Sequence, residues 1–391
     1  MQSYATEAIK ATTYGEKAFC KFLSANDTKP GQSHQAGIYI PKNSYSLLFD
    51  SPGVKGENKD RLSEIQWHYD DVFITESRFI YYGRGTRDEY RITRTPIFRP
   101  EFTGALFVLV KRAECSYQAF VLDSDEDIND YLDSIGLSPL ETNSLIERRP
   151  TTTDENEEIL IRNFIDELNE LGIEFPDSCR MAKKAREISD RLHNQLNYSI
   201  LNPDQCLIDW TNSEYNVFRA IEHSRYGKFL ASGFPTVDEF INVANQVLNR
   251  RKSRAGKSLE HHLSALFDCN GVLYESQVIT EGNKKPDFIF PSSAAYHNYL
   301  FPTNKLISLA AKTTCKDRWR QILNEADRLK NGYKYLCTLQ QGISEKQMDE
   351  MKSEKVVLVV PRPYIKSFPQ SKQSDIWTIE KFVSFVKETE M

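Results

Sequence analysis

The stretch Lys284-Lys285-Pro286-Asp287-Phe288-Ile289-Phe290 places an acid directly before a short apolar segment. A second apolar segment, Leu306-Ile307-Ser308-Leu309-Ala310-Ala311, ends at Lys312. Short apolar runs bounded by polar residues are typical of buried strands. An unpaired buried ammonium group is costly, so Lys312 must emerge at its strand end or be paired. We expect the two strands to bring Asp287 and Lys312 together.

A third candidate, Glu325, follows in the segment Asp317 to Lys330, which we predict to be a helix. One face of that helix would carry Arg318, Ile322, Glu325 and Leu329, which recur at i, i+4, i+7 and i+11. This row could bring the Glu325 carboxylate back to the end of the strand that carries Lys312.

Two carboxylates and a lysine suit a site that holds Mg²⁺ and a phosphodiester together, because Mg²⁺ prefers oxygen ligands. We expect Asp287 and Glu325 to bind the metal ion. We expect Lys312 to lower the pKa of a water molecule and to stabilise charge that grows on phosphorus. Glu260, on the preceding helical segment, is a fourth candidate for a metal or water contact. The sequence therefore predicts a nuclease.

Each residue also has a plainer interpretation. A single Pro-Asp pair or strand lysine is usually a turn or a solvated face, and Glu260 alone would normally be a surface residue. The acidic run from Asp123 to Asp130 resembles a calcium loop, but Ile128 stands where the sharp turn needs glycine. We therefore reject the calcium loop. His261 and His262 have no third ligand at metal spacing, so we expect them to be solvated or packed.

Length and composition indicate a protein of two domains with ordinary cores. The chain has 391 residues, of which 40% are hydrophobic and 27% charged, and single cores usually stop growing near ~250–300 residues. No apolar run approaches the ~18 residues of a membrane helix, and we expect no signal peptide. Seven scattered cysteines without metal or disulfide spacing suggest reduced thiols. We expect the protein to stay inside the cell.

The net charge of -5 conceals an uneven distribution. Arg250, Arg251, Lys252, Arg254 and Lys257 lie close together, whereas acidic residues crowd 123–130 and 154–158. Phosphate contacts need local positive charge rather than a positive sum. A duplex binder with an acidic flank fits this pattern.

The chain divides by pattern into three parts. Residues 1–150 read as a β-rich domain with a small barrel between about 20 and 125. The boundary near 149–158 combines a proline, a threonine run and an acidic run, which is the composition of a linker. We expect 151–176 to be a charged linker with a helical spacer that could reach Phe175 and Pro176. Residues 177–391 begin with helical spacing and continue beyond 270 as alternating strands and helices, giving an α/β (α+β) domain.

Three strings carry a resemblance to a known family. They are Arg250 to Glu260, Thr280 to Phe288 and Lys312 to Asp327. The chain resembles the EcoRII family of type II restriction endonucleases, closely over about 177–370. The N-terminal part is similar more loosely, through 23–28, 34–41 and 91–94.

The resemblance implies a homodimeric, Mg²⁺-dependent enzyme of the PD-(D/E)xK nuclease fold, with a central mixed sheet flanked by helices. Such enzymes cut double-stranded DNA before the first C of CCWGG, where W is A or T. It also implies a variant catalytic order, because Ala310 stands where the second acid normally lies and Glu325 supplies the missing carboxylate. A cognate cytosine methyltransferase would be a functional, not a physical, partner.

By the same resemblance, Lys316, Asp317 and Arg318 would read the C:G pairs, with Arg320 as a further DNA contact. Arginine and lysine donate to guanine, and aspartate accepts from the cytosine amino group. The central base pair would be flipped out and stacked at Tyr215. This chain has Trp210-Thr211-Asn212-Ser213 where the family has an arginine run, so Trp210 could itself stack.

The N-terminal domain resembles the family's effector domain, a pseudobarrel that binds a second copy of the target. The implied DNA contacts form two arms: Asn26, His34 and Tyr39 in one, and Arg87, Arg91 and Arg94 in the other. The arginine-rich segment 84–94 could equally be a solvated hairpin. In the family this domain covers the nuclease cleft until effector DNA binds, and the charged linker would then be a hinge.

Two other functions remain open at this point. One is a sequence-specific DNA-binding regulator with an inactive nuclease domain, against which the presence of Asp287, Lys312 and Glu325 argues. The other is a mismatch-repair nickase acting at the same sequence, which would cut one strand of an unmodified duplex.

Overall fold

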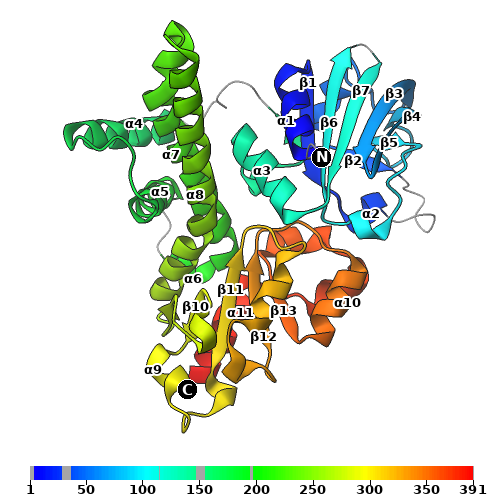
Figure 1. Cartoon of the computed structure of the whole chain (residues 1–391). Helices are drawn as coiled ribbons and strands as arrows, with labels where there is room; N and C mark the ends of the chain where they lie inside the picture. Colours follow the sequence, from blue (N-terminus) through cyan, green and yellow to red (C-terminus); the bar gives the residue numbers. More distant parts are fainter. Residues whose placement is uncertain (1–3, 29–36, 114, 147–154, 194–196, 391) are drawn as a thin grey trace.

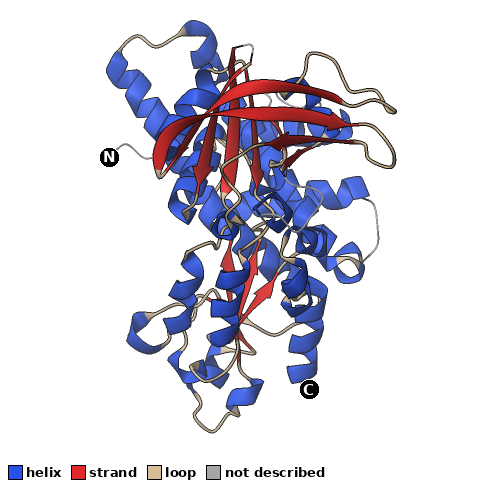
Figure 2. Ribbon diagram, turned by 90° about the vertical axis from the view of Figure 1, so that its right-hand side faces the viewer, coloured by secondary structure: helices blue, strands red, loops and turns tan. Residues whose placement is uncertain are grey.

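The chain folds around two separate β-sheets joined by long helices (Figures 1 and 2). The structure is a computed structural model, and it describes residues 4–28, 37–113, 115–146, 155–193 and 197–390. Across these ranges, none of the helices combines the length and the apolar character needed to cross a membrane.

The N-terminal sheet has eight strands in the order β2-β5-β4-β3-β7-β6-β1-β8. Their bounds are β1 Lys17–Phe22, β2 Ile38–Ile40, β3 Lys59–Tyr69, β4 Asp71–Tyr82, β5 Glu89–Thr93, β6 Leu106–Ala113, β7 Ser116–Leu122 and β8 Ser144–Leu145. Only β3 and β7 pair in parallel; the other neighbours are antiparallel. The sheet curls strongly (Figure 2), as expected for a pseudobarrel, with β2 and β8 at its two edges.

Alternation along the strands gives this sheet two apolar faces. Strand β6 shows the alternation well, because Phe107 and Leu109 enter the core inside the curl while Leu106 and Val108 enter the outer core. Helices α1 (Tyr4–Tyr14) and α3 (Asp125–Ile135) cover the outer face. Ser124 caps α3 and Gly136 ends it in the left-handed conformation. Helix α2 (Ala25–Thr28) is a single turn before β2.

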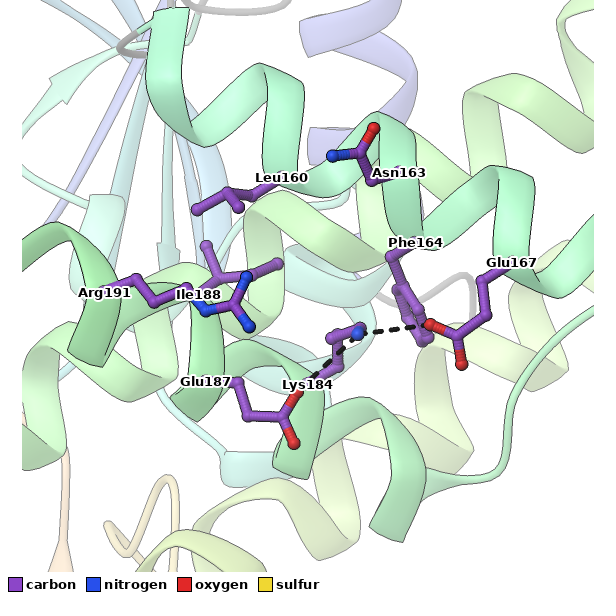
Figure 3. A pocket seen from close by; sticks show the side chains of 8 residues that line it. All are labelled: Leu160, Asn163, Phe164, Glu167, Lys184, Glu187, Ile188 and Arg191. Carbon is purple, nitrogen blue, oxygen red and sulfur yellow. Dashed lines mark ion pairs between the residues drawn. The ribbon is translucent and has the colours of Figure 1, made fainter.

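A group of helices connects the two sheets. It consists of α4 Glu155–Glu170, α5 Ser178–His193, α6 Tyr198–Leu201, α7 Pro203–Ser232 and α8 Val237–Cys269. Part of the expected linker, 151–176, is therefore a packed helix, since Ile161, Phe164 and Leu168 of α4 share a core with α5 and α7. Figure 3 shows the contact, in which Lys184 of α5 pairs with Glu167 of α4 at 3.2 Å.

The second sheet is mixed, as expected, with the order β13-β12-β11-β10-β9. Its strands are β9 Glu275–Ser276, β10 Phe288–Phe290, β11 Ile307–Lys312, β12 Lys334–Thr338 and β13 Val356–Val359. Strands β11, β12 and β13 are parallel, whereas β9 and β10 are antiparallel. Helices α8 and α11 (Ile379–Glu390) pack on one face, and α10 (Glu345–Ser353) packs on the other. Helix α9 (Ser293–His297) follows β10.

Candidate active site and nucleic-acid interface

Asp287 and Lys312 meet at the ends of neighbouring strands. Strands β10 and β11 pair with Phe288 opposite Leu309, so Asp287 lies beside the end of β11. The Lys312 ammonium group donates to Asp287 Oδ2 at 2.9 Å, and the backbone N–H of Ala311 donates to the same oxygen at 2.8 Å. Asp287 is only 5% exposed. The pair that the sequence placed on two strand ends is therefore in contact, with its carboxylate fixed from two sides.

Gln277 joins this pair to the long helix. Its side-chain amide donates to Asp287 Oδ1 at 3.2 Å and to Glu260 Oε2 at 3.0 Å. Its φ of +54° lies in the left-handed region, which residues other than glycine rarely adopt. Gln277 could not be identified from the sequence, because a lone glutamine in a polar segment gives no signal of what it bridges.

Glu260 reaches the same cluster from α8. Burial raises its pKa to about 7, with Asp287 adding to the shift and Lys312 and Gln277 opposing it. A carboxyl group with this pKa changes its protonation state near neutral pH. This places Glu260 beside Asp287 and Lys312, as the sequence suggested it could lie.

Glu325 is brought near the cluster by a different backbone from the one predicted. The expected helix from Asp317 to Lys330 is wrong: the structure has two short 3₁₀ helices, η6 (Arg318–Asn324) and η7 (Asp327–Leu329). Glu325 is the C-cap of η6, and its carbonyl accepts a hydrogen bond from Thr280 Oγ at 2.6 Å. Burial raises the pKa of Glu325, with Lys312 opposing and Asp287 reinforcing the shift. The tighter 3₁₀ winding abolishes the predicted i, i+4, i+7 row.

The suitability of this cluster for a metal ion depends on its oxygen atoms. Over the residues that the structure describes, no three His, Cys, Asp or Glu side chains are gathered in a group that could hold a metal ion. However, Glu325 Oε2 is buried and has no hydrogen-bond partner. A buried carboxylate oxygen without a donor is costly, and a hard cation would satisfy it. The residues present are therefore chemically suited to bind Mg²⁺. In this structure the two carboxylate oxygens of Asp287 accept hydrogen bonds from Gln277 and Lys312.

The segment 316–318 lies against the N-terminal unit rather than in solvent. The carboxylate of Asp125, at the start of α3, accepts hydrogen bonds from the backbone N–H groups of Lys316, Asp317 and Arg318 at 3.1, 2.8 and 2.9 Å. In return, the backbone N–H of Asp125 donates to Asp317 Oδ1 at 3.4 Å. The hydrogen bond to Asp125 raises the pKa of Asp317 to about 6, and burial adds to this shift.

Lys316 itself is enclosed by the same contact. Its ammonium group donates to the carbonyl of Glu101 at 3.0 Å and forms an ion pair with Asp123. Only 4% of its side chain is exposed, and burial lowers its pKa. Arg320 is exposed and pairs with Glu350 of α10 at 2.6 Å. We name the set of contacts between α3 and segment 314–318 the clasp.

The other end of α3 meets helices α7 and α8. Arg251 donates to the carbonyls of Asp133 and Ser134 at 3.1 and 2.6 Å, and Arg219 donates to the carbonyl of Gly136 at 2.9 Å. These carbonyls lie at the C-terminus of α3, where positive charge is favourable. Both ends of α3 are therefore held by the part of the chain that carries the long helices and the second sheet.

Tyr215 and Trp210 are both buried on α7. Tyr215 is 5% exposed, and the guanidinium group of Arg254 lies 3.7 Å from the centre of its ring. Trp210 is 2% exposed and donates its indole N–H to Asp190 at 2.8 Å. Base stacking at either residue stays a prediction, since neither ring is open to solvent here.

The two arms expected in the N-terminal unit meet at one sheet edge. Strand β2 pairs with β5 so that Tyr39 lies opposite Arg91. Asn26 is exposed on α2 and Arg94 is exposed just after β5 with a φ of +57°. Arg87 stacks on Tyr82, with 5.2 Å between its guanidinium carbon and the ring centre. His34 lies outside the described residues.

Arg91 differs from its neighbours because it is buried. It is 5% exposed, donates to the carbonyl of Gly37 at 3.0 Å and pairs with Glu89 at 3.1 Å. In this arrangement Arg91 joins the strand β5 to the residue before β2. Its expected contact with DNA stays a prediction.

Two family models match separate parts of the chain. The family model "Restriction endonuclease EcoRII, N-terminal" matches residues 12–150, and "EcoRII C terminal" matches residues 218–383. The type II restriction enzyme EcoRII of Escherichia coli is 36% identical over 396 residues, covering 94% of this chain and 93% of that protein. The chain belongs to the EcoRII family of type II restriction endonucleases.

Solved structures similar to this EcoRII family member are also restriction endonucleases. Metal-depleted Ecl18kI in complex with uncleaved, modified DNA is 20% identical with a TM-score of 0.46, covering 59% of this chain and 83% of that chain. Restriction endonuclease PspGI in complex with substrate DNA is 17% identical with a TM-score of 0.40, covering 62% and 95%.

Proposed function

We propose that this chain is a Mg²⁺-dependent type II restriction endonuclease that cuts both strands of DNA at CCWGG. The observation that carries the proposal is the cluster of Asp287, Lys312, Glu325 and Glu260, together with membership of the EcoRII family. A regulator with an inactive nuclease domain would have no use for a buried, unpartnered carboxylate oxygen beside a strand-end lysine.

Asp287 and Glu325 would hold the Mg²⁺ ion, with Glu260 as a further oxygen donor. When bound, Mg²⁺ supplies positive charge next to the scissile phosphate. The chain itself contributes orientation: Ala311 and Gln277 fix the Asp287 carboxylate, and Gln277 ties it to Glu260. Lys312, now paired with Asp287, would turn its ammonium group toward the charge that develops on the phosphate oxygens.

Recognition of the C:G pairs would come from Lys316, Asp317 and Arg318. Their hydrogen-bonding groups match the guanine and cytosine edges in the major groove. Arg320 and the flipped-base position at Tyr215 and Trp210 complete the proposed DNA contacts of the nuclease. These residues lie on or beside the clasp or in the helical core, so DNA binding would require rearrangement there.

The N-terminal domain would act as an effector that relieves autoinhibition. In the present structure Asp125 of α3 binds the backbone of 316–318, and Glu101 and Asp123 enclose the Lys316 ammonium group, so a closed clasp would keep DNA from being read there. A second CCWGG copy would bind at the β2–β5 edge through Asn26, His34, Tyr39, Arg87, Arg91 and Arg94. We propose 1–150 as the effector domain, 151–176 as the spacer and 177–391 as the nuclease.

The proposed enzyme would act as a homodimer in a cell that also protects its own DNA. Cutting both strands at a symmetric site needs two active centres, which a homodimer supplies. A cytosine methyltransferase of the same specificity would protect the host DNA without contacting this chain. We propose that the enzyme works in the cytoplasm of a prokaryotic cell.

One experiment tests the core of the proposal. A mapped plasmid with several CCWGG sites is digested with purified protein and Mg²⁺, and the ends are sequenced. We expect cuts on both strands before the first C. Nicks on one strand only would favour the mismatch-repair nickase, and no cutting at any site would favour the DNA-binding regulator.

A further inference from the structure

Strand β13 forms one edge of the second sheet, and its outer side is only partly paired. On its inner side it pairs with β12, and the N–H of Lys334 donates to the carbonyl of Lys355 at 3.0 Å. Successive residues of a strand turn their backbone groups to opposite sides, so the N–H and C=O groups of Val356, Leu358 and Val360 face outward. Figure 1 shows β13 beside α10 at this side of the sheet.

Trp377 pairs with one half of this outer edge. Its N–H donates to the carbonyl of Leu358 at 2.9 Å, and its carbonyl accepts from the N–H of Val360 at 2.8 Å. The chain before Trp377 turns away, because it forms the 3₁₀ helix η9 (Gln370–Asp375). Within the described part of the chain, no hydrogen bond reaches the outward N–H and C=O of Val356 or the N–H of Leu358. This half of the edge is therefore open.

A cavity of about 710 Å³ lies along the open half. Tyr335, Val357 and Phe385 line it on the side of the sheet that α11 covers, and Met348, Met351 and Ile376 line it on the side that α10 covers. The edge of β13 runs between these two apolar sides. The volume lies within the range of about 300–1,000 Å³ that is typical of sites that enclose a ligand.

The backbone at the centre of the cavity favours an extended chain over a compact ligand. A small amphiphile could cover the apolar sides, but it would bury the open N–H and C=O groups without partners, which is costly. An added strand supplies N–H and C=O groups at the spacing of β13 and turns successive side chains to the two sides. Because both sides are apolar, its side chains should form an unbroken apolar run of about three or four residues.

Charge around the cavity indicates what flanks this apolar run. Lys352 and Lys355 line the cavity and are exposed, and the ammonium group of Lys381 lies 4.4 Å from the ring centre of Trp377. The acid among the lining residues is Asp375, which pairs with Lys352 at 3.0 Å. Positive charge is therefore in excess, and acidic residues should flank the apolar run, because charges across an interface are complementary.

We propose that β13 is a docking site for an extended segment of another protein, which joins the five-stranded second sheet at its open edge. The segment has an apolar run flanked by acids, and its backbone bonds to Val356 and Leu358. Strand β12 separates this edge from β11, which carries Lys312, so docking leaves the catalytic cluster in place. The inference does not depend on the proposed nuclease.

The test begins with a phage-displayed library of random decapeptides, selected on the full-length protein without DNA or metal. We expect the selected peptides to share an apolar run flanked by aspartate or glutamate. Each is then synthesised with one N-methyl group at each position in turn. Binding should weaken by about 10-fold or more at every second residue of the run, where the methyl group removes an N–H that faces β13. The residues between should tolerate it.

Amide exchange on the protein gives a second readout. A bound peptide should slow exchange at Val356 and Leu358 by about 10-fold or more, because their N–H groups gain acceptors. Exchange at Val357 should not change, because its N–H already faces β12. This alternation distinguishes an added strand from a peptide that binds through its side chains alone.

Two variants and a matched control locate the binding site. Val357→Asp places a charge in the cavity and should weaken peptide binding by about 10-fold or more. Phe385→Ala removes part of the lining from a different element and should act in the same direction. The control Val72→Asp makes the same replacement at a valine of β4 that is 51% exposed in the other sheet, and it should bind like the wild type. Circular dichroism shows whether each variant is folded, and the N-methyl series decides if Val357→Asp is not.

The inference is overturned if the selected peptides bind the cavity variants and the control equally, or if every position tolerates N-methylation. It is also overturned if the amphiphile anilinonaphthalene sulfonate binds the wild type but not Phe385→Ala, and no selected peptide displaces it, because the cavity then holds a small molecule. Slow exchange at Val356 and Leu358 before any peptide is added would show that the edge is already covered, which also contradicts the proposal.

Discussion

Lys312 is the residue on which the proposed chemistry depends most directly. Its ammonium group lies 2.9 Å from Asp287 Oδ2, beside the proposed metal ligands, where we propose that phosphate charge would grow. Lys312→Ala should lower the rate of cleavage by about 10²–10³-fold or more, as when one charge-stabilising donor is removed, and leave DNA binding intact. Rates on a multi-site plasmid and gel-shift affinity measure the two effects. Lys305→Ala, at the other end of the same strand region, is the control, and retained cutting in Lys312→Ala would remove the assignment.

Glu260 offers a pH test that does not require cleavage. Its pKa is raised to about 7 in the folded protein, so its contribution to stability is fully present below its ordinary pKa and lost as pH rises through about 7. Without metal, Glu260→Gln should match the wild type at pH 5 and be more stable at pH 8, by about 1–2 kcal/mol after allowance for solvent screening. Urea unfolding in EDTA measures the difference. The control is Glu275→Gln, which replaces an exposed acid on β9 and should change the free energy of unfolding equally at both pH values. If Glu260→Gln also changed it equally at both pH values, that result would contradict the raised pKa of Glu260.

At the level of elements, the clasp should be opened by a single substitution in α3. Asp125→Ala removes the acceptor of three backbone hydrogen bonds from 316–318, and hydrogen bonds to a charged group are the strong ones. We expect amide exchange at Lys316, Asp317 and Arg318 to accelerate by about 10-fold or more. The exposed neighbour Glu126→Ala is the control, and unchanged exchange in Asp125→Ala would show that the carboxylate does not hold the segment.

The clasp should also weaken as pH rises. The pKa of Asp317 is raised to about 6 in the closed state, so protonation favours closure. That contribution is complete below the ordinary pKa of an aspartate and disappears above about pH 6. Exchange at 316–318, corrected for the intrinsic rate, should be slower at pH 5 than at pH 7.5 in the wild type. In Asp125→Ala this pH effect should be absent.

Sequence patterns predicted the elements that depend on local periodicity and missed those that depend on remote contacts. The strands around Asp287 and Lys312 were predicted because apolar runs mark them. The segment after Lys312 was predicted as one helix, but Trp319 and Ile322 anchor it in the core with α10 as short 3₁₀ turns instead. The acidic run at 123–130 was rejected as a calcium loop, and nothing local indicated that Asp125 would bind 316–318. Gln277 was missed for the same reason.

At the level of the whole molecule, the proposed control and the proposed chemistry occupy different places. The N-terminal unit contacts segment 316–318, which we propose reads the target, and the helices α7 and α8. Asp287, Lys312 and Glu260 are tied together by hydrogen bonds elsewhere, between α8 and the second sheet. A closed clasp would therefore block reading of the target without dismantling the catalytic cluster. Because α3 is held at both ends, loss of Asp125 opens the clasp, whereas departure of the whole helix also requires that Arg219 and Arg251 release its C-terminal carbonyls.

This arrangement predicts how cutting depends on the number of target sites. Plasmids with several CCWGG sites should be cut readily, since one copy can open the clasp for another, and single-site plasmids should be cut poorly. A short duplex that carries CCWGG, added in excess, should restore cutting of the single-site plasmid, and the same duplex with a scrambled site should not. Initial rates by gel electrophoresis measure the ratio. Asp125→Ala should raise the single-site rate toward the multi-site rate, because the clasp is already open. Equal rates on both plasmids in the wild type would mean that the contact between α3 and 316–318 does not restrain the enzyme.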